Sequence, residues 1–599
     1  MLIPKTKKSC RPSGMLVLLM AMLSLSLVRA PASAQEPVRP PLLLVVPDTD
    51  TTVTASATYR LSGSTLPGLS VRLNDKALRV YPNGVFVGLL RLEQGENRFT
   101  LAAVDSPDVA VQKEFLIVRK PPLTSTPRDT LAIDSVMIEP SQDLWLNEGD
   151  LLRVQIKGTP GCTATFLNGM PMNEVVPSGP NSLEGIYRGV YRVRADDMWE
   201  EVPLQFALTD SGGRSVVRAS SGRITVRPGL FPMVGIARGE RPYLNYGLGE
   251  DRLGGAKLSF INAGVRLTLT GKAGDQYRVA LAENQEAWIP EQQVEVQPEG
   301  TPPPFSLTGS WNVYGEKNHD YVTIALSDKL PYASFVEGNP TRVFVDLYGA
   351  VSNSNWITQH LTTREILNVS YRQVEKNLLR ITVELKHPQV WGYALGYRGN
   401  TLVLKVRRQP EKLDLNRLTI MLDAGHGGTN DGAIGSTGAK EKDINLATVF
   451  HLKQLLEAEG AKVLLTRQND TSSTNSERLK AIIGSEADLL ISIHSNSIGN
   501  TTDPEATRGV STYYRHQCFR PLSQAIYARV LKTGLMPFGN VGGFNFTLNA
   551  PTELPNVLVE LAFMSHPEDE MKLLDDRFRR EIAERIVEGV EDFLESNEE

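Results

Sequence analysis

The sequence predicts several all-β modules followed by a C-terminal α/β domain with a mainly parallel sheet. The chain has 599 residues, whereas a single hydrophobic core rarely serves more than about 250–300 residues. Short runs in which apolar and polar residues alternate fill residues 35–409, as expected for half-buried antiparallel strands. From residue 417 onward, continuous apolar runs alternate with helical patterns, which is typical of a sheet covered by helices on both faces.

The first segment, residues 1–34, has the three parts of a secretory signal peptide. Basic residues precede a short apolar run at 15–28, and a small-residue cleavage site follows at 32–34. A membrane anchor would need about 20 apolar residues, which is more than this run offers. We therefore predict export to the periplasm or the cell exterior. No other segment is long and apolar enough to cross a bilayer, so the mature chain is expected to have no membrane span.

Two β-sandwiches are predicted after the signal peptide, at 35–122 and 130–227. Both contain short alternating strands separated by turn residues such as Asn, Asp and Gly. A Leu-Asn pair recurs at a similar place in each segment, at 73–74 and 167–168, which indicates a faint repeat. The two segments resemble the immunoglobulin-like modules of bacterial surface proteins. We expect them to act as spacers.

A third β module is predicted at 228–300. Consecutive strands at 264–271 and 274–281 are followed by the stretch Glu286-Ala-Trp-Ile-Pro290. This pattern resembles the last strands of a bacterial Src-homology-3-like barrel, and the resemblance implies binding of cell wall or peptide. Trp288 could contact such a ligand, but a position in the core is the favoured interpretation, because small barrels depend on large aromatic residues.

A fourth β module is predicted at 305–409, where four alternating strands occur. One of them contains the stretch Arg342-Val-Phe-Val-Asp-Leu347, and the segment resembles the AMIN domain of Gram-negative cell-wall enzymes. The resemblance implies targeting to peptidoglycan or to the division site. A further structural β module would fit the alternation equally well.

The C-terminal domain, predicted at 417–597, opens with a strand that leads to a histidine. Residues 418–422 form an apolar run, and Asp423 and a glycine-rich turn around His426 follow. Glycines allow a tight turn and the close approach of a ligand. Open α/β sheets place their sites at the carboxyl ends of such strands. A surface histidine in a tight turn is the alternative.

Two further residues complete a candidate metal site. A second apolar strand at 487–493 leads to His494, and Glu441 begins a helical pattern that ends at Gly460. A first-turn glutamate also complements the helix dipole, which is the alternative for Glu441. Two histidines and one carboxylate, however, form the ligand set of catalytic zinc hydrolases, which keep a fourth position open.

Five stretches of this domain resemble, in order, the type 3 family of zinc-dependent N-acetylmuramoyl-L-alanine amidases. They are 423–428, 432–443, 492–496, 508–514 and 554–565. An ordered match in several parts is more specific than a lone motif. The resemblance implies zinc (Zn2+) as the cofactor, Glu560 as the catalytic residue, and three metal ligands: His426, Glu441 and His494.

Glu560 also has a chemical reason to be the catalytic group. It ends the apolar run 557–559, and an apolar environment raises the pKa of a carboxyl group. Such a group can take a proton from the attacking water and return it to the leaving amine. The alternative is a strand-end carboxylate paired with a neighbouring lysine or arginine.

The sequence departs from the family pattern after Glu560. Ala562 replaces a glycine and His566 replaces an asparagine. We expect His566 to be inert, although an imidazole near the site could also bind substrate or metal. The link at 497–508 is too short for the inhibitory helix that some family members carry. Residues 567–599 are predicted to form one charged amphipathic helix.

The resemblance implies an exported hydrolase that cleaves the amide between N-acetylmuramic acid and L-alanine in peptidoglycan, for wall remodelling and daughter-cell separation. Peptidoglycan is then the substrate, and a division-site activator protein is a candidate partner. The net charge of −5 gives no basic excess that would indicate nucleic-acid binding. Two alternatives stay open: a non-catalytic peptidoglycan-binding protein with a degenerate amidase fold, and a zinc peptidase that cuts within the stem peptide.

Overall fold

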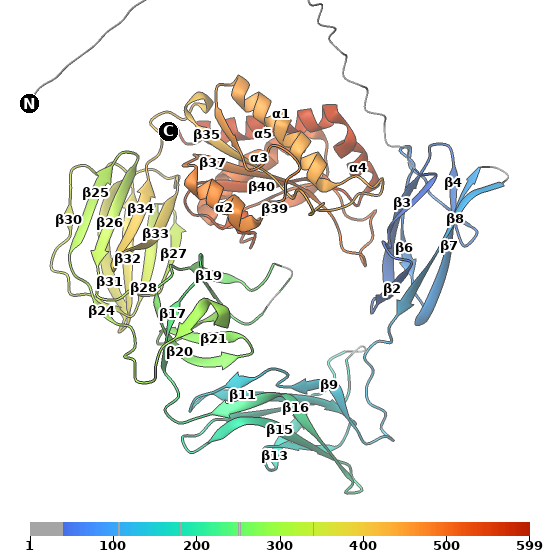
Figure 1. The fold of residues 1–599 in the computed structure, drawn as a ribbon, viewed down its shortest axis with the longest axis horizontal. Helices are drawn as coiled ribbons and strands as arrows, with labels where there is room; N and C mark the ends of the chain where they lie inside the picture. Colours follow the sequence, from blue (N-terminus) through green and yellow to red (C-terminus); the bar gives the residue numbers. More distant parts are fainter. Residues whose placement is uncertain are drawn as a thin grey trace, which may run out of the picture. The chain divides into compact units, whose positions relative to one another are not determined.

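The structure, a computed structural model, describes residues 40–105, 108–179, 182–249, 251, 253–339 and 341–598. The predicted signal peptide, 1–34, lies outside the described residues. The predicted fold class is confirmed, because β modules precede a C-terminal α/β domain with a mostly parallel sheet (Figure 1). Among the described residues, no helix combines the length and apolar character needed to cross a membrane. Cys162 and Cys518 are both free thiols.

The first module consists of two sheets that share one core. Apolar side chains of both sheets, such as Leu61, Phe86, Leu101 and Phe115, are buried together between them, which makes this segment a sandwich. The three-stranded sheet contains β1 (Leu42–Val46), β3 (Thr58–Thr65) and β6 (Val85–Arg91). The five-stranded sheet contains β2 (Thr51–Thr54), β8 (Asp108–Arg119), β7 (Gly95–Asp105), β4 (Ser70–Leu73) and β5 (Lys76–Leu78).

The next two predicted modules are joined by one strand ladder. The short strand β10 (Leu144–Trp145) pairs in parallel with β16 (Ser215–Val226) and antiparallel with β20 (Arg266–Ala273). The ladder therefore runs across the boundary predicted near residue 228.

The remaining strands of this ladder fall on either side of that boundary. Those before it are β9 (Ile133–Glu139), β11 (Leu151–Gly158), β12 (Thr163–Phe166), β13 (Met170–Glu174), β14 (Ile186–Arg192) and β15 (Trp199–Thr209). Those after it are β17 (Met233–Ala237), β18 (Tyr243–Asn245), β19 (Lys257–Phe260), β21 (Gln276–Ala282), β22 (Gln285–Pro290) and β23 (Val294–Val296). The single turn η1 (Glu291–Gln293) precedes β23.

Trp288 is half-buried, so the expectation that it lies in the core is wrong. Its neighbours in β22, Ala287 and Ile289, are both fully buried. Because successive side chains of a strand point to opposite faces, Trp288 is directed to the outer face of β22. Tyr277, on β21, is the aromatic residue that this core buries.

The segment with the AMIN resemblance is built from two larger sheets around a common core. The four expected strands correspond to β26 (His319–Ala325), β28 (Arg342–Tyr348), β32 (Leu378–Leu385) and β34 (Thr401–Arg407). They pair with β25 (Trp311–Glu316), β27 (Tyr332–Glu337), β31 (Ile366–Glu375) and β33 (Tyr393–Arg398), and β30 (Thr358–Gln359) pairs with β25. A two-stranded ladder of β24 (Ser306–Leu307) and β29 (Ala350–Val351) completes the segment.

The C-terminal domain contains a six-stranded sheet in the order β36-β35-β37-β40-β38-β39. The first four strands are parallel, β38 is antiparallel to β40, and β39 is parallel to β38. The carboxyl ends of β35, β37 and β40 therefore meet at one edge, where open sheets bind ligands. The strands are β35 (Thr419–Ala424), β36 (Lys462–Leu465), β37 (Leu489–Asn496), β38 (Val510–Tyr513), β39 (Pro537–Val541) and β40 (Asn556–Phe563).

Helices cover both faces of this sheet (Figure 1). Ile420 and Leu422 of β35 pack with α1 (Glu441–Ala458), α3 (Arg520–Val530) and α5 (Asp576–Glu595), whereas Met421 packs with α2 (Asn475–Gly484). Thr474 and Glu477 form a capping box at the start of α2. Short turns of helix complete the domain: η2 (Leu415–Arg417), η3 (Gln517–Phe519), η4 (Leu531–Thr533) and η5 (Thr547–Asn549).

The single helix predicted from residue 567 to the end of the chain is wrong, because α4 (Pro567–Leu574) and α5 are separate helices. Asp575 lies between them with extended backbone angles (φ −77°, ψ 119°). Its carboxylate accepts a hydrogen bond from the backbone N–H of Arg577 and so caps α5. A capping carboxylate of this kind breaks a helical pattern without any glycine or proline as a signal.

Side chains from outside the predicted C-terminal domain are buried in its core, among them Trp391, Leu413 and Leu415. Trp391 is 1% exposed and packs within the same apolar cluster as β35, β37 and α5. Its ring centroid lies 5.9 Å from that of Phe593. The indole N–H donates a hydrogen bond of 3.0 Å to the side-chain oxygen of Gln409. The core of the domain thus includes residue 391.

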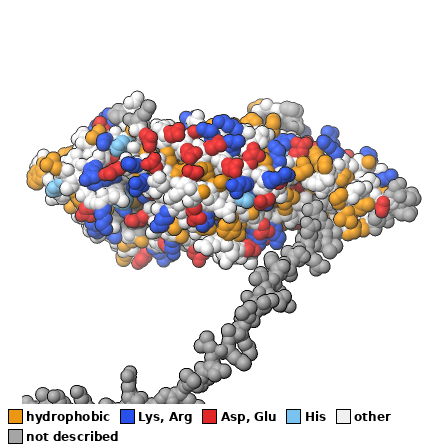
Figure 2. Space-filling view, turned by 90° about the horizontal axis from the view of Figure 1, so that it is seen from above, with side chains coloured by type: hydrophobic (Ala, Val, Ile, Leu, Met, Phe, Trp, Pro, Cys, Tyr) orange, Lys and Arg blue, Asp and Glu red, His pale blue; other side chains and the backbone are white. Residues whose placement is uncertain are grey.

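The surface carries both signs of charge. The chain has 63 basic and 68 acidic side chains, and Figure 2 shows the two kinds interspersed over the face that it presents. Interspersed charges offset one another within about one Debye length, which is about 8 Å at physiological ionic strength.

Candidate metal centre

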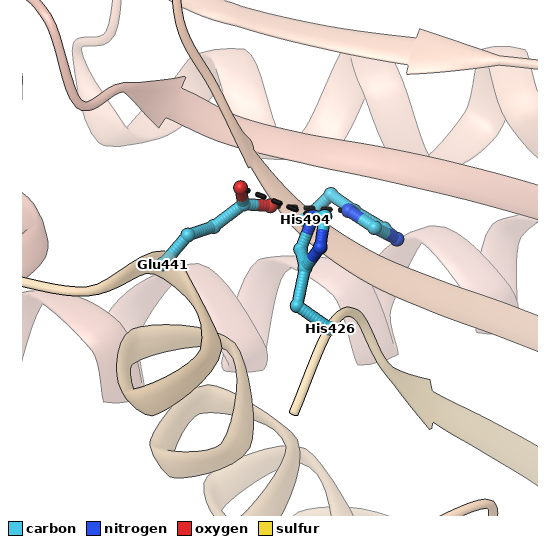
Figure 3. A group of neighbouring side chains, drawn as sticks. All are labelled: His426, Glu441 and His494. Carbon is cyan, nitrogen blue, oxygen red and sulfur yellow. Dashed lines mark hydrogen bonds and ion pairs between the residues drawn. The ribbon is translucent and has the colours of Figure 1, made fainter. Parts of the chain in front are cut away.

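Three predicted ligands converge at the carboxyl edge of the sheet. His426 lies in the loop after β35, Glu441 is the first residue of α1, and His494 lies on β37 (Figure 3). Each residue offers one nitrogen or oxygen atom, and these atoms lie within 4.8 Å of one another. The two imidazole rings meet edge to face, with centroids 4.9 Å apart. The cluster has the donor set that catalytic zinc sites use.

The carboxylate of Glu441 lies between the two imidazoles. Its Oε2 is 3.2 Å from Nε2 of His426, and its Oε1 is 3.1 Å from Nδ1 of His494. Backbone N–H groups fix its orientation, because Ala433 donates to Oε2 at 2.7 Å and Ser495 donates to Oε1 at 3.0 Å. Glu441 is 4% exposed.

These contacts shift the pKa values of the cluster. Burial alone would raise the pKa of Glu441, but hydrogen bonds from His426 and His494 outweigh it and hold that pKa well below its usual range. Burial alone would lower the pKa of His494, but the Glu441 carboxylate outweighs it and raises that pKa to about 9. The carboxylate is therefore ionised, which is the form that binds a metal, and a metal that binds here has to displace the proton of His494.

Regular strand pairing positions His494. In β37, Ile493 is paired with Ala424 of β35, and His494 is paired with Glu560 of β40. The strand β35 continues into Gly425, where a Cβ atom would lie 2.3 Å from Cε1 of the His494 ring. Only glycine permits this close approach.

A buried carboxylate ties the two histidine-bearing strands together. Asp423, the residue before the end of β35, is fully buried. It accepts hydrogen bonds from the hydroxyls of Ser492 at 2.6 Å and Thr466 at 2.7 Å. Ser492 lies on β37, two residues before His494, so this bond couples the ends of both strands.

A second buried carboxylate holds the loop that leads to Glu441. Glu570, on α4, is 0% exposed. It accepts hydrogen bonds from the N–H of Ser436 at 3.1 Å, from the N–H of Thr437 at 2.9 Å and from the Thr437 hydroxyl at 2.6 Å. The loop is further confined at Gly432, where a Cβ atom would lie 2.5 Å from the Glu441 carboxylate.

Glu560 is buried on β40 beside the cluster. It is 8% exposed and pairs in register with His494 on one side and with Ser511 on the other. Side chains at paired positions of neighbouring strands point to the same face of a sheet. Glu560 and His494 therefore share the face of the sheet that carries α2, while Val559 and Leu561 pack into the opposite core.

His566 lies outside the cluster of three and has a structural contact of its own. Its Nδ1 accepts a hydrogen bond of 3.3 Å from the backbone N–H of Glu568, which makes it the N-cap of α4. It is 4% exposed, and burial lowers its pKa. The neutral imidazole that this favours is the form that can accept a hydrogen bond.

A cavity of about 150 Å³ opens beside His426 and His494. A water molecule occupies about 30 Å³ in the liquid, so the cavity has room for several waters or for a single amide group. Phe546 and Leu548 form part of its apolar wall, and Asn430 and Asn475 contribute polar groups. The Phe546 ring is stacked on His494, with centroids 6.2 Å apart.

Sequence reasoning missed Glu570, Asp423 as a link between strands, and Arg478, which lines the cavity. Glu570 stands among other acidic residues in the first turn of α4, and nothing in that pattern distinguishes it. The capping box before Arg478 predicts where its helix begins and gives no indication of what the side chain contacts.

Two family profiles match separate parts of the chain. The profile of the N-acetylmuramoyl-L-alanine amidases matches residues 420–592, and the AMIN domain profile matches residues 312–406. The first match contains His426, Glu441, His494 and Glu560.

Curated relatives are similar over the C-terminal part. The probable cell wall amidase LytH of Staphylococcus epidermidis is 30% identical over 229 residues, which make up 38% of this chain and 75% of that protein. The protein of the same name from Staphylococcus saprophyticus is 33% identical over 201 residues, or 33% of this chain and 66% of that protein.

Solved structures include the catalytic domain of CwlV, an N-acetylmuramoyl-L-alanine amidase from Bacillus (Paenibacillus) polymyxa var. colistinus. It is 30% identical, and the match covers 30% of this chain and 98% of that one with a TM-score of 0.28.

Proposed function

Because the chain belongs to the N-acetylmuramoyl-L-alanine amidase family, we propose that it is an exported zinc hydrolase that cleaves the amide between N-acetylmuramic acid and L-alanine in peptidoglycan. The family and the curated relatives support amidase activity on peptidoglycan. The cluster of His426, Glu441 and His494, in which the Glu441 carboxylate is buried, is the observation that supports a metal-dependent reaction.

The proposed metal ligands are His426, Glu441 and His494. Two imidazoles and one ionised carboxylate, preorganised by strand pairing and backbone N–H groups, suit zinc. Zinc bound there would lower the pKa of water and polarise the scissile carbonyl. The adjoining cavity offers room for the substrate amide.

Glu560 is the proposed acid and base. Its side chain lies beside His494 on the same face of the sheet, so it is placed to take a proton from the attacking water. It would then return that proton to the nitrogen of the leaving L-alanine as the amide bond breaks. Because Glu560 is 8% exposed, bulk water has little access to the proton that it would transfer.

The remaining segments fit a role in wall remodelling and daughter-cell separation. The segment 1–34 is the proposed export signal, which would place the enzyme in the periplasm or outside the cell. The AMIN match supports binding to peptidoglycan, and a division-site activator is the proposed protein partner. The segments 35–122 and 130–227 are the proposed immunoglobulin-like spacers.

The test is mass spectrometry of the soluble products after the full chain has been incubated with zinc and purified peptidoglycan. We expect free stem peptides with an N-terminal L-alanine. Glu560→Gln keeps the size of the side chain but not its basicity, and should lower the rate about 10²–10⁴-fold while zinc stays bound.

Other products would contradict the proposal. Fragments cut inside the stem peptide would indicate a zinc peptidase. In another outcome, the chain binds zinc and peptidoglycan but releases no product, even when cell extract is added as a source of activators. That result would indicate the non-catalytic binding protein.

A further inference from the structure

The loop that carries His426 leaves regular secondary structure just before the metal centre. The last ladder contact is the hydrogen bond of 2.9 Å from the N–H of Gly425 to the carbonyl of Ile493. His426 itself has φ +62°. This left-handed conformation costs a residue with a side chain about 1–2 kcal/mol. Contacts outside the strand ladder must therefore stabilise it.

A buried arginine supplies such contacts. Arg478, on α2, is 3% exposed. Its Nη1 donates hydrogen bonds to the carboxylate of Asp423 and to the carbonyl of Ala424, both at 2.7 Å. Its Nη2 donates to the carbonyl of His426. One guanidinium group thus spans the end of β35 and the strained residue.

A second arginine holds the first part of the same loop. Arg467 is 5% exposed, and its Nε donates to the carbonyl of Ala424 at 2.8 Å. Its Nη2 donates to the carbonyl of Gly425 at 3.1 Å. The three successive carbonyls of residues 424–426 are therefore bound by guanidinium groups, and Arg478 is the arginine that reaches the last of them.

We propose that Arg478 is a positioning residue that holds His426 in its left-handed conformation and so directs the imidazole toward Glu441. This inference rests on the proposed role of His426 as a metal ligand. Arg478 acts through the backbone carbonyl of His426, and its pairing with Asp423 compensates a charge that would otherwise be costly to bury.

The geometry requires arginine at this position. A guanidinium group has five N–H donors in a planar fork, so it can bind one carboxylate and two carbonyls at once. A lysine ammonium is a compact point charge. In Arg478→Lys it would pair with Asp423 and leave the carbonyl of His426 without its guanidinium donor.

The test compares metal binding by the full chain and by Arg478→Lys. Zinc affinity is measured by competition with a chelator, and the visible spectrum of the Co2+-substituted protein reports the coordination geometry. We expect zinc affinity to fall about 10–100-fold, as for other groups that support a metal ligand, and the cobalt spectrum to change. Circular dichroism checks that the variant is folded.

Arg408 offers a matched control in the AMIN segment. It donates to the buried carboxylate of Asp320 at 2.8 Å and to the carbonyls of Lys317 at 2.7 Å and Thr362 at 2.8 Å. Arg408→Lys therefore loses the same kinds of hydrogen bond, to Asp320, Lys317 and Thr362, none of which is a proposed metal ligand. Its zinc affinity and cobalt spectrum should equal those of the wild-type chain.

A second variant covers the case in which Arg478→Lys does not fold. Asp423→Asn combined with Arg478→Gln replaces the buried ion pair by a neutral pair, which avoids leaving one charge unpaired. The glutamine side chain is too short to reach the carbonyl of His426, so zinc affinity should again fall about 10-fold or more.

The outcomes separate this inference from the proposed function. Wild-type zinc affinity and an unchanged cobalt spectrum in a folded Arg478 variant would overturn the positioning role. If His426→Ala binds zinc as tightly as the wild-type chain, His426 is not a ligand, and both ideas fail. Zinc binding through His426 without release of peptides would overturn the amidase function alone.

Discussion

The two histidines of the cluster are held in place in different ways. His494 is part of a strand, and its neighbours on both sides fix its backbone through the regular ladder of β35, β37 and β40. His426 lies beyond the end of a strand in a left-handed conformation, and buried side chains hold its backbone instead. Two proposed ligands of the same kind are thus presented by two kinds of support.

The difference has a consequence for mutational sensitivity. A ladder distributes its hydrogen bonds over many residues, so no single side chain carries the position of His494. A loop held by side chains depends on a few of them, and the loss of a buried hydrogen-bonding partner costs about 1–3 kcal/mol. We therefore expect the His426 side of the site to be the more vulnerable to substitutions away from the ligands.

The largest effect on zinc affinity is expected at Gly425, where the chain just before His426 contacts the ring of His494. In Gly425→Ala the new Cβ would lie 2.3 Å from Cε1 and 2.5 Å from Nε2 of His494, so the ring must move. Zinc affinity, measured by chelator competition, should fall about 100-fold. Gly499→Ala is the control, since a Cβ there meets nothing within 4 Å. Equal affinities for the two variants would show that the strand tolerates the displacement.

The third proposed ligand, Glu441, extends the comparison, because the loop before it depends on Glu570. In the wild-type chain the Glu570 carboxylate accepts hydrogen bonds from the N–H groups of Ser436 and Thr437. Glu570→Gln places an amide group opposite them instead. We expect a loss of about 2–3 kcal/mol in the free energy of unfolding of the C-terminal domain, since hydrogen bonds to charged groups are involved, and about tenfold weaker zinc binding. Urea denaturation and chelator competition measure the two effects.

The exposed Glu459, at the end of α1, provides the control for that substitution. Glu459→Gln should change neither quantity. If Glu570→Gln behaves like Glu459→Gln, the loop before Glu441 is held by its own backbone.

A smaller effect is expected for the link between the two strands. Ser492→Ala removes the hydrogen bond of 2.6 Å to Asp423, which keeps its bonds to Thr466 and Arg478. The free energy of unfolding should fall by about 1–2 kcal/mol, whereas zinc affinity should change less than in Gly425→Ala. A drop in zinc affinity as large as that of Gly425→Ala would mean that the ladder alone does not position His494.

The smallest effect is expected for the ring stacked on His494. Phe546→Leu removes an aromatic contact worth about 0.5–1.5 kcal/mol, and zinc affinity should fall by less than tenfold. Phe335→Leu removes a stacked pair with Phe344 in the AMIN segment, with centroids 4.9 Å apart, and should leave zinc affinity unchanged. A large effect of Phe546→Leu would mean that stacking, rather than strand pairing, orients His494.

The sequence predicted those parts of the fold that depend on local patterns. Apolar runs predicted β35 and β37, and the glycines around His426 predicted a tight turn at the strand end. Each of these features follows from residues close together in the chain. The ordered family motifs indicated which strand ends carry the candidate site residues.

Features that depend on distant partners were not predictable in this way. Arg478 is 55 residues from Asp423, and Glu570 is 134 residues from Ser436. The joining of the second and third β modules likewise depends on β10, which is only two residues long. Such a strand is too short to produce a periodic signal.

The burial of Trp391 sets a limit on how this enzyme can be divided and recombined. The amidase family profile begins at residue 420, yet residue 391 contributes an indole that is 1% exposed inside the catalytic core. Loss of a buried aromatic side chain costs about 3–5 kcal/mol, a large share of the roughly 5–15 kcal/mol that stabilises a typical domain. A chain cut or exchanged between these two positions would keep every proposed catalytic residue but would have a cavity next to Phe593. The unit that evolution or an engineer can transplant intact is therefore longer than the segment that carries the motifs, and it has to bring the end of the preceding module with it.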